Sequence, residues 1–281
     1  MPKTMLRIGC LEMSSGPDVQ ENLNVIAAAV DASPLLDLLV LPENAVQMPS
    51  SKALQYVELA SGGIVQSALS ELAASKQMAI LLGSLAVVES DGANRTKPYA
   101  RSLLFDPLGK LVAAYDKLHL FDVDTQPGAS HQYRESDTYR AGVVSIEQTS
   151  PKQLVFNDLP LQLGLTICYD LRFPELYRLL AQRGAQLICV PAAFTYETGK
   201  AHWETMLRCR AIENQVFIAA AAQVGKHASG RRTWGHSMII DPWGEIITEQ
   251  TDGQGLVFAE IDLTKIESLK ERFPVHLHRR L

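Results

Sequence analysis

Residues 164–175 read Gly164-Leu165-Thr166-Ile167-Cys168-Tyr169-Asp170-Leu171-Arg172-Phe173-Pro174-Glu175. The apolar residues up to Ile167 predict a buried strand, and Pro174 with Glu175 predicts the start of a helix. A thiol at this junction lies at the edge of a sheet, where the N–H groups and positive end of the next helix favour a thiolate and a developing oxyanion. Cysteine is more often a packed core residue than a reactive one. A role for Cys168 in chemistry therefore requires partners elsewhere in the chain.

The composition is typical of an ordinary globular protein. The chain has 281 residues, of which 47% are hydrophobic and 20% charged, and its net charge is -5. This balance argues against a disordered chain and gives no general attraction to nucleic acid. The basic clusters at Lys226 with Arg231-Arg232 and at residues 276–280 are expected to be solvated loop and tail.

The spacing of the cysteines and the hydropathy of the chain indicate the cellular compartment. The four cysteines are far apart and match neither a zinc site nor a disulfide framework. Residues 1–4 lead into a strand-like segment without the apolar core of a signal peptide, and no apolar run has transmembrane length. We therefore expect a cytoplasmic protein with reduced thiols and no membrane or metal partner.

Apolar runs of strand length alternate with amphipathic stretches of helix length almost from end to end, which predicts a layered α/β protein. Strands are expected at 5–13, 37–41, 78–88, 161–167, 186–190 and 216–223, and helices at 17–30, 63–76, 174–183 and 201–214. Each half also contains a hairpin, turning on Asp106-Pro107-Leu108-Gly109 or Asp241-Pro242-Trp243-Gly244. Two sheets packed face to face, with helices outside, fit this pattern. Residues 121–150 lack periodicity and are expected to form a long loop.

Two charged residues stand where predicted strands end. Glu43 follows the strand that ends before Pro42, and Lys117 follows Leu111-Val112-Ala113-Ala114-Tyr115-Asp116. A carboxylate could take the thiol proton, and an ammonium could hold an oxyanion. Each could equally mark the point where a strand meets water, and His119 could be a histidine on a strand face. Motifs of serine hydrolases, zinc proteases and nucleotide-binding proteins are absent from the sequence.

Three ordered motifs resemble those of the nitrilase superfamily of carbon–nitrogen hydrolases. They are Leu41-Pro42-Glu43-Asn44, Tyr115-Asp116-Lys117-Leu118-His119-Leu120-Phe121-Asp122, and Cys168-Tyr169-Asp170-Leu171-Arg172-Phe173-Pro174-Glu175. The resemblance covers essentially the whole chain and implies a single domain, 1–281, with a four-layer α-β-β-α sandwich. It implies that Glu43 is the general base, Lys117 the oxyanion stabiliser and Cys168 the nucleophile. Glu135 matches an additional glutamate beside the lysine.

The second half is similar to the deaminated glutathione amidase branch. The similar stretches are Pro191-Ala192-Ala193-Phe194, residues 198–204, residues 208–215 and residues 235–244, and residues 220–227 favour this branch over the sister ω-amidase branch. Lys200 departs from the proline that many members have after Thr-Gly. The resemblance implies hydrolysis of the primary amide of deaminated glutathione through a thioester, with release of ammonia or the corresponding amine.

Other activities stay open at this level. An ω-amidase acting on 2-oxo acid amides such as α-ketoglutaramate is the alternative, and a nitrilase or a scaffold without catalysis is less favoured. Tyr169, Arg172, Phe194 and Thr198 are candidates for substrate binding, although Arg172 could instead pair with Asp170 or Glu175. The family implies homodimers built through the outer helices and requires no cofactor.

Overall fold

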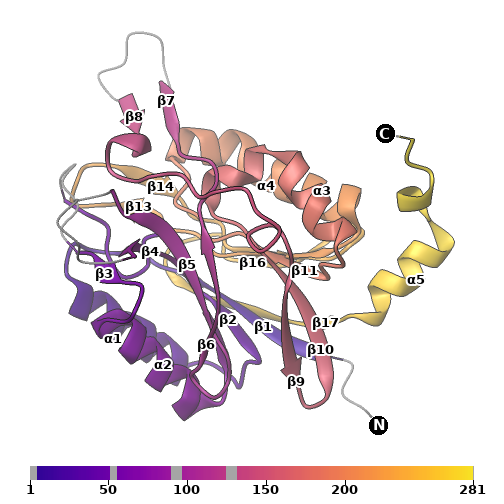
Figure 1. Cartoon of the computed structure of the whole chain (residues 1–281), viewed down its shortest axis with the longest axis horizontal. Coiled ribbons are helices and arrows are strands. Elements are labelled where there is room, and N and C mark those ends of the chain that lie inside the picture. The colour runs from indigo at the N-terminus through magenta and orange to yellow at the C-terminus, as the bar shows by residue number, and fades with distance from the viewer. Residues whose placement is uncertain (1–4, 51–55, 90–96, 125–131, 281) are drawn as a thin grey trace.

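The computed structural model describes residues 5–50, 56–89, 97–124 and 132–280. Within these ranges, no helix is long and apolar enough to cross a membrane. Two large sheets face each other in the centre, and helices cover their outer faces (Figure 1). This is the four-layer α-β-β-α sandwich expected from the sequence.

The first sheet is built mainly from the N-terminal half. Its order among the described residues is β17 (Gly255–Asp262), β1 (Met5–Glu12), β2 (Leu38–Val40), β4 (Ala79–Val88), β5 (Tyr99–Phe105) and β6 (Leu111–Asp116), with β3 (Glu58–Leu59) beside β4. Strands β1, β2 and β4 are parallel, and the others in this row run antiparallel to their neighbours. The carboxyl ends of β2 and β4 therefore meet at one edge.

The second sheet comes from the C-terminal half. Its order in the described chain is β16 (Ile246–Glu249), β15 (Met238–Ile240), β12 (Phe217–Ala220), β11 (Leu187–Cys189), β10 (Leu159–Leu165) and β9 (Lys152–Phe156). The three central strands β10, β11 and β12 are parallel. They are almost wholly apolar, as expected for strands that are covered on both faces.

Helices cover each sheet from outside (Figure 1). Helices α1 (Val19–Asp31) and α2 (Ile64–Lys76) pack on the first sheet, and α3 (Pro174–Gln182) and α4 (Tyr196–Asn214) pack on the second. Helix α5 (Thr264–Arg272) follows β17 near the end of the chain. One apolar core joins the two sheets, and a second fills the space under α1 and α2.

The two predicted hairpin turns have the same construction. The Asp106 carboxylate accepts hydrogen bonds from the N–H groups of Leu108 and Lys110, both at 2.9 Å, and Asp241 does the same for Trp243 and Glu245 at 2.9 and 3.0 Å. The glycine that closes each turn has a positive φ, +80° or +88°, a conformation that suits glycine. The four residues of each Asp-Pro-x-Gly stretch therefore suffice to predict its turn.

Two expectations about local structure were wrong. Helix α4 begins at Tyr196 and not at residue 201, so Gly199 lies inside it. A Cβ atom there would lie 2.2 Å from the Cβ of Trp234, so this glycine serves a close packing contact and not a helix boundary. The segment 121–150 is also more regular than expected, because its described part contains β7 (Asp122–Asp124), β8 (Gln132–Arg134) and a 3₁₀ turn, η1 (Glu135–Asp137).

Candidate active site

Three of the side chains predicted to be catalytic each follow the end of a strand, and they lie together in the structure. Glu43 follows β2 and Lys117 follows β6 in the first sheet, whereas Cys168 follows β10 in the second. Gly83 in β4 allows this approach, since a Cβ atom there would lie 2.2 Å from the carbonyl oxygen of Pro42. The site is therefore assembled from both sheets of the sandwich.

The backbone at Cys168 turns sharply. Its φ is +46°, which is uncommon for a residue with a side chain, and its N–H donates to the carbonyl oxygen of Pro191 at 2.8 Å. A 3₁₀ turn, η2 (Cys168–Arg172), separates the thiol from helix α3. Helix α3 begins at Pro174, as expected from the sequence, but the 3₁₀ turn between it and the thiol was not expected.

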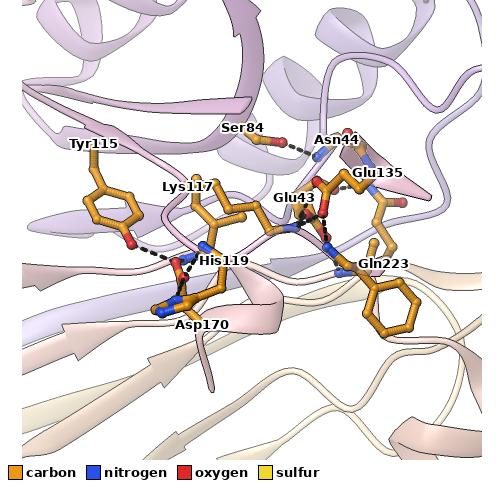
Figure 2. A network of polar contacts seen from close by, with 12 residues as sticks. Glu43, Asn44, Ser84, Tyr115, Lys117, His119, Glu135, Asp170 and Gln223 are labelled. Atoms are coloured by element: carbon orange, nitrogen blue, oxygen red, sulfur yellow. Dashed lines mark hydrogen bonds and ion pairs between the residues drawn. The ribbon is translucent and has the colours of Figure 1, made fainter. Parts of the chain in front are cut away.

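Lys117 is the centre of a buried ionic cluster (Figure 2). Its Nζ lies 2.7 Å from Oε1 of Glu43 and 2.9 Å from each carboxylate oxygen of Glu135. Glu43 also accepts a hydrogen bond from the N–H of Ala193 through Oε2, at 2.9 Å, and the Cys168 thiol lies near enough for the two groups to shift each other's pKa. The N–H of Phe121 donates to Glu135 at 2.7 Å. Each group is held by more than one contact.

Burial and neighbouring charges set the protonation of these groups. Burial and the Glu43 carboxylate raise the pKa of the Cys168 thiol well above its usual value. Burial opposes charge on Lys117, but Glu135 and Glu43 outweigh it and raise its pKa well above the ordinary value. Burial also works against ionised Glu43, yet the Lys117 ammonium lowers its pKa, whereas burial leaves the pKa of Glu135 raised. The resting site thus combines a neutral thiol, an ionised Glu43 and an ammonium.

A second network, around Asp170, fixes the turn that carries the thiol (Figure 2). Asp170 is fully buried. Its Oδ2 accepts hydrogen bonds from the hydroxyl of Tyr115 at 2.7 Å and the N–H of Ile167 at 2.9 Å. Its Oδ1 contacts the N–H of His119 at 3.1 Å and Nδ1 of that ring at 2.7 Å. These contacts join the β6 end to the Cys168 turn, so neither His119 nor Asp170 is merely a surface or strand-face residue.

The ionic cluster opens into a pocket of about 740 Å³. All four residues expected to bind substrate line it, namely Tyr169, Arg172, Phe194 and Thr198. Arg172 pairs with neither Asp170 nor Glu175; its Nη1 lies 3.8 Å from Sδ of Met206 and its Nη2 lies 3.4 Å from Nδ1 of His202. Phe194 packs on Trp203 with ring centroids 4.9 Å apart.

Arg231 was missed by the sequence analysis. It was expected in a solvated loop, but it lines the pocket and donates through Nη2 to the carbonyl oxygen of Ala193. Nothing near Arg231 in the sequence signals this, because the contact depends on the packing of the β13 (Val224–Lys226) and β14 (Arg232–Trp234) hairpin against residues 191–195. No group of three or more His, Cys, Asp or Glu side chains suited to a metal ion occurs in the part of the chain that the structure describes.

The pocket of the sandwich brings together a cysteine, a buried lysine and two glutamates, an arrangement that suits a hydrolase with a cysteine nucleophile. Comparison with known proteins agrees with this class. Residues 7–271 match the family model for carbon–nitrogen hydrolases. The chain belongs to the carbon–nitrogen hydrolase family, and it is therefore an amide-hydrolysing enzyme.

Similar proteins cover nearly the whole chain. A deaminated glutathione amidase of Yersinia enterocolitica is 39% identical over 276 residues, which cover 97% of this chain and 92% of that protein. The Caenorhabditis elegans nitrilase and fragile histidine triad fusion protein has a crystal structure with a TM-score of 0.85 and 34% identity; the match covers 100% of this chain and 66% of the longer fusion. A Saccharomyces cerevisiae member of branch 10 of the nitrilase superfamily has a TM-score of 0.80 and 29% identity, covering 99% and 98% of the two chains.

Proposed function

We propose that the protein is a deaminated glutathione amidase that uses Cys168 as nucleophile, Glu43 as general base, Lys117 as oxyanion stabiliser and Glu135 as a support for the lysine. The observation that carries the catalytic part is the buried ammonium of Lys117, which contacts both glutamates beside the thiol. The similarity to the amidase of Yersinia enterocolitica supports the choice of substrate.

The reaction proceeds in two halves. Glu43 takes the proton of the Cys168 thiol, and the sulfur attacks the amide carbonyl carbon to form a C–S bond. Lys117 Nζ and the backbone N–H of Tyr169 stabilise the oxyanion; one such donor contributes about 3 kcal/mol. The C–N bond then breaks, and Glu43 returns the proton to the leaving nitrogen. In the second half, Glu43 deprotonates water, which attacks the thioester, and the released sulfur regains a proton.

The chemistry of the substrate corrects one expectation. Glutathione is a tripeptide whose backbone amides are all substituted, so replacing its amino group by an oxo group leaves no primary amide. Cleavage of such an amide releases an amine and not ammonia. A primary amide is the substrate only in the ω-amidase reaction, so the two activities differ in the nitrogen product.

The predicted substrate-binding residues fit an anionic amide. Arg172 has no ion pair with any residue of the described chain, and its Cζ lies 5.9 Å from the ring centroid of Tyr169 and 5.4 Å from that of Phe194. A guanidinium held between aromatic rings is a good partner for a carboxylate. We infer that Arg172 binds a carboxylate of the substrate, with Tyr169, Phe194 and Thr198 forming the adjacent wall.

Steady-state kinetics test the proposal. Deaminated glutathione and α-ketoglutaramate are compared under the same conditions, with amine and ammonia release measured separately. We expect the higher kcat/KM for deaminated glutathione; a clear preference for α-ketoglutaramate would identify an ω-amidase instead. Cys168→Ala is expected to abolish turnover while circular dichroism stays unchanged, and a variant with full turnover would refute the thioester route.

Location and assembly are further parts of the proposal. We infer a cytoplasmic protein from the free cysteines, of which Cys10, Cys168 and Cys189 are buried. A homodimer through the outer helices α3 and α4 and the tail after α5 is also proposed. Large apolar side chains near these elements are 49–61% exposed, which would suit burial in an interface; they are Ile212, Trp243 and Phe273. Sedimentation at micromolar concentration tests this, and a monomer would contradict it.

A further inference from the structure

The loop between β13 and β14 has a fixed shape. Its first residue, His227, is buried and hydrogen-bonds through Nε2 to Oγ1 of Thr233 at 2.8 Å and through Nδ1 to the carbonyl oxygen of Ser15 at 3.2 Å. The backbone N–H of His227 donates to the carbonyl oxygen of Arg231, and the N–H of Gly230 donates to that of His227, both at 2.8 Å. The loop is therefore fastened independently of the Arg231 side chain.

Arg231 is positioned by its neighbours beside the general base. Nη2 of Arg231 donates a hydrogen bond to the carbonyl oxygen of Ala193. The backbone N–H of Ala193 in turn donates to Oε2 of Glu43 at 2.9 Å. The Cζ of Arg231 lies 5.5 Å from the ring centroid of Tyr133, another pocket residue. The guanidinium therefore has a defined place in the pocket wall.

The charge of Arg231 lacks a partner. Among the described residues it forms no ion pair, and its Nε is buried without a hydrogen bond. A partly buried cation with an unsatisfied donor is costly unless an anion neutralises it. The charge of Arg231 contributes to lowering the pKa of Glu43, but the oxygens of Glu43 contact Lys117 and Ala193 and form no ion pair with Arg231. The charge remains available to a ligand.

We propose that Arg231 is a second anion-binding residue of the pocket, distinct from Arg172, and that it selects amides that carry a carboxylate. The inference rests on the proposed function only in taking this pocket as the substrate site. The two arginines contact different rings, Tyr133 for Arg231 and Tyr169 with Phe194 for Arg172. Deaminated glutathione carries two carboxylates, one at each end, whereas a simple 2-oxo acid amide carries one. Two separate arginines therefore suit the longer substrate.

The test uses small electrophiles in place of the substrate. Iodoacetate and iodoacetamide both alkylate a thiol by forming a C–S bond with loss of iodide, but only iodoacetate is anionic. The rate of each reaction at Cys168 is followed by intact mass in a Cys209→Ser background, because Cys209 is exposed on α4. A positive charge near the thiol attracts only the anionic reagent, so the ratio of the iodoacetate rate to the iodoacetamide rate measures that charge.

Arg231→Gln is expected to lower the iodoacetate to iodoacetamide ratio about tenfold, as loss of one charge interaction in a partly buried site would do. Arg231→Lys should keep the ratio within about twofold, because the charge remains. Lys226→Gln removes the same charge from the exposed end of β13 and should change nothing. An unchanged ratio in Arg231→Gln, or an equal fall in Arg231→Lys, would overturn the proposal.

The same variants separate this inference from the proposed substrate. If deaminated glutathione is not hydrolysed but the ratio falls as expected, the proposed function fails and the anion site stands. If it is hydrolysed, Arg231→Gln should raise KM for it about tenfold and have little effect on its glycine methyl ester. An equal rise of KM for acid and ester would show that Arg231 does not bind that carboxylate.

Discussion

Glu135 contacts Lys117 Nζ with both carboxylate oxygens, each at 2.9 Å, whereas Glu43 contacts it with one oxygen at 2.7 Å. The second oxygen of Glu43 is left for the N–H of Ala193. The two glutamates therefore differ in their contacts, although both lie beside the same ammonium. In the proposed mechanism, Glu135 holds the ammonium in place and Glu43 exchanges a proton with the thiol.

This difference predicts the effect of Glu135→Gln. Without the second carboxylate, the ammonium interacts more strongly with Glu43 and makes it a weaker base, so kcat should fall about 100-fold or more. The protein should remain folded, because Gln can still accept hydrogen bonds from Lys117 and Phe121. Steady-state kinetics and thermal unfolding check this, with Glu147→Gln on the exposed surface as a charge-matched control. Full activity of Glu135→Gln would show that Glu135 has no part in the proposed mechanism.

The thiol of Cys168 should stay protonated in the free enzyme above neutral pH. Burial and Glu43 raise its pKa well above the usual value, so the neutral form persists as the pH passes through the range where a free thiol ionises. The absorbance at 240 nm, compared between the protein and Cys168→Ala from pH 6 to pH 9, should show no thiolate from this residue. A titration in that range would mean that the thiolate exists before substrate binds.

Asp170→Asn should damage both stability and catalysis. The carboxylate accepts hydrogen bonds from Tyr115, Ile167 and His119 in a fully buried site, and an amide nitrogen cannot accept in place of one oxygen. We expect a loss of about 2–4 kcal/mol in the free energy of unfolding, measured in urea. Tyr115→Phe removes only one donor and should cost about 1 kcal/mol. Equal losses for the two variants would argue against Asp170 as the organiser of the turn.

Arg172→Lys tests the substrate contact of this arginine. The planar guanidinium lies near two rings and has no ion pair within the described chain, so its replacement should raise KM about tenfold or more with a small change in thermal stability. The control is Arg178→Lys on α3, whose Nη1 donates to the carbonyl oxygen of Glu213 outside the pocket. A large loss of stability with unchanged KM would make Arg172 a structural residue.

The sequence predicted those parts of the protein that depend on local patterns or on an ordered set of motifs. The strand ends at Glu43, Lys117 and Cys168 were located because apolar runs stop there, and the hairpins because Asp-Pro-x-Gly has its own turn chemistry. Arg231 and the start of α4 were missed for one shared reason. Each depends on a residue far away in the sequence, the backbone carbonyl of Ala193 for Arg231 and the side chain of Trp234 for Gly199.

The origin of the site in two different sheets has a consequence for heat inactivation. Glu43 and Lys117 follow strands of one sheet and Cys168 follows a strand of the other, so the apolar core between the sheets sets the distance between the proposed base and the proposed nucleophile. A small slip of one sheet on the other would leave every strand intact and still separate Glu43 from Cys168. Activity should therefore disappear on heating before the secondary structure melts.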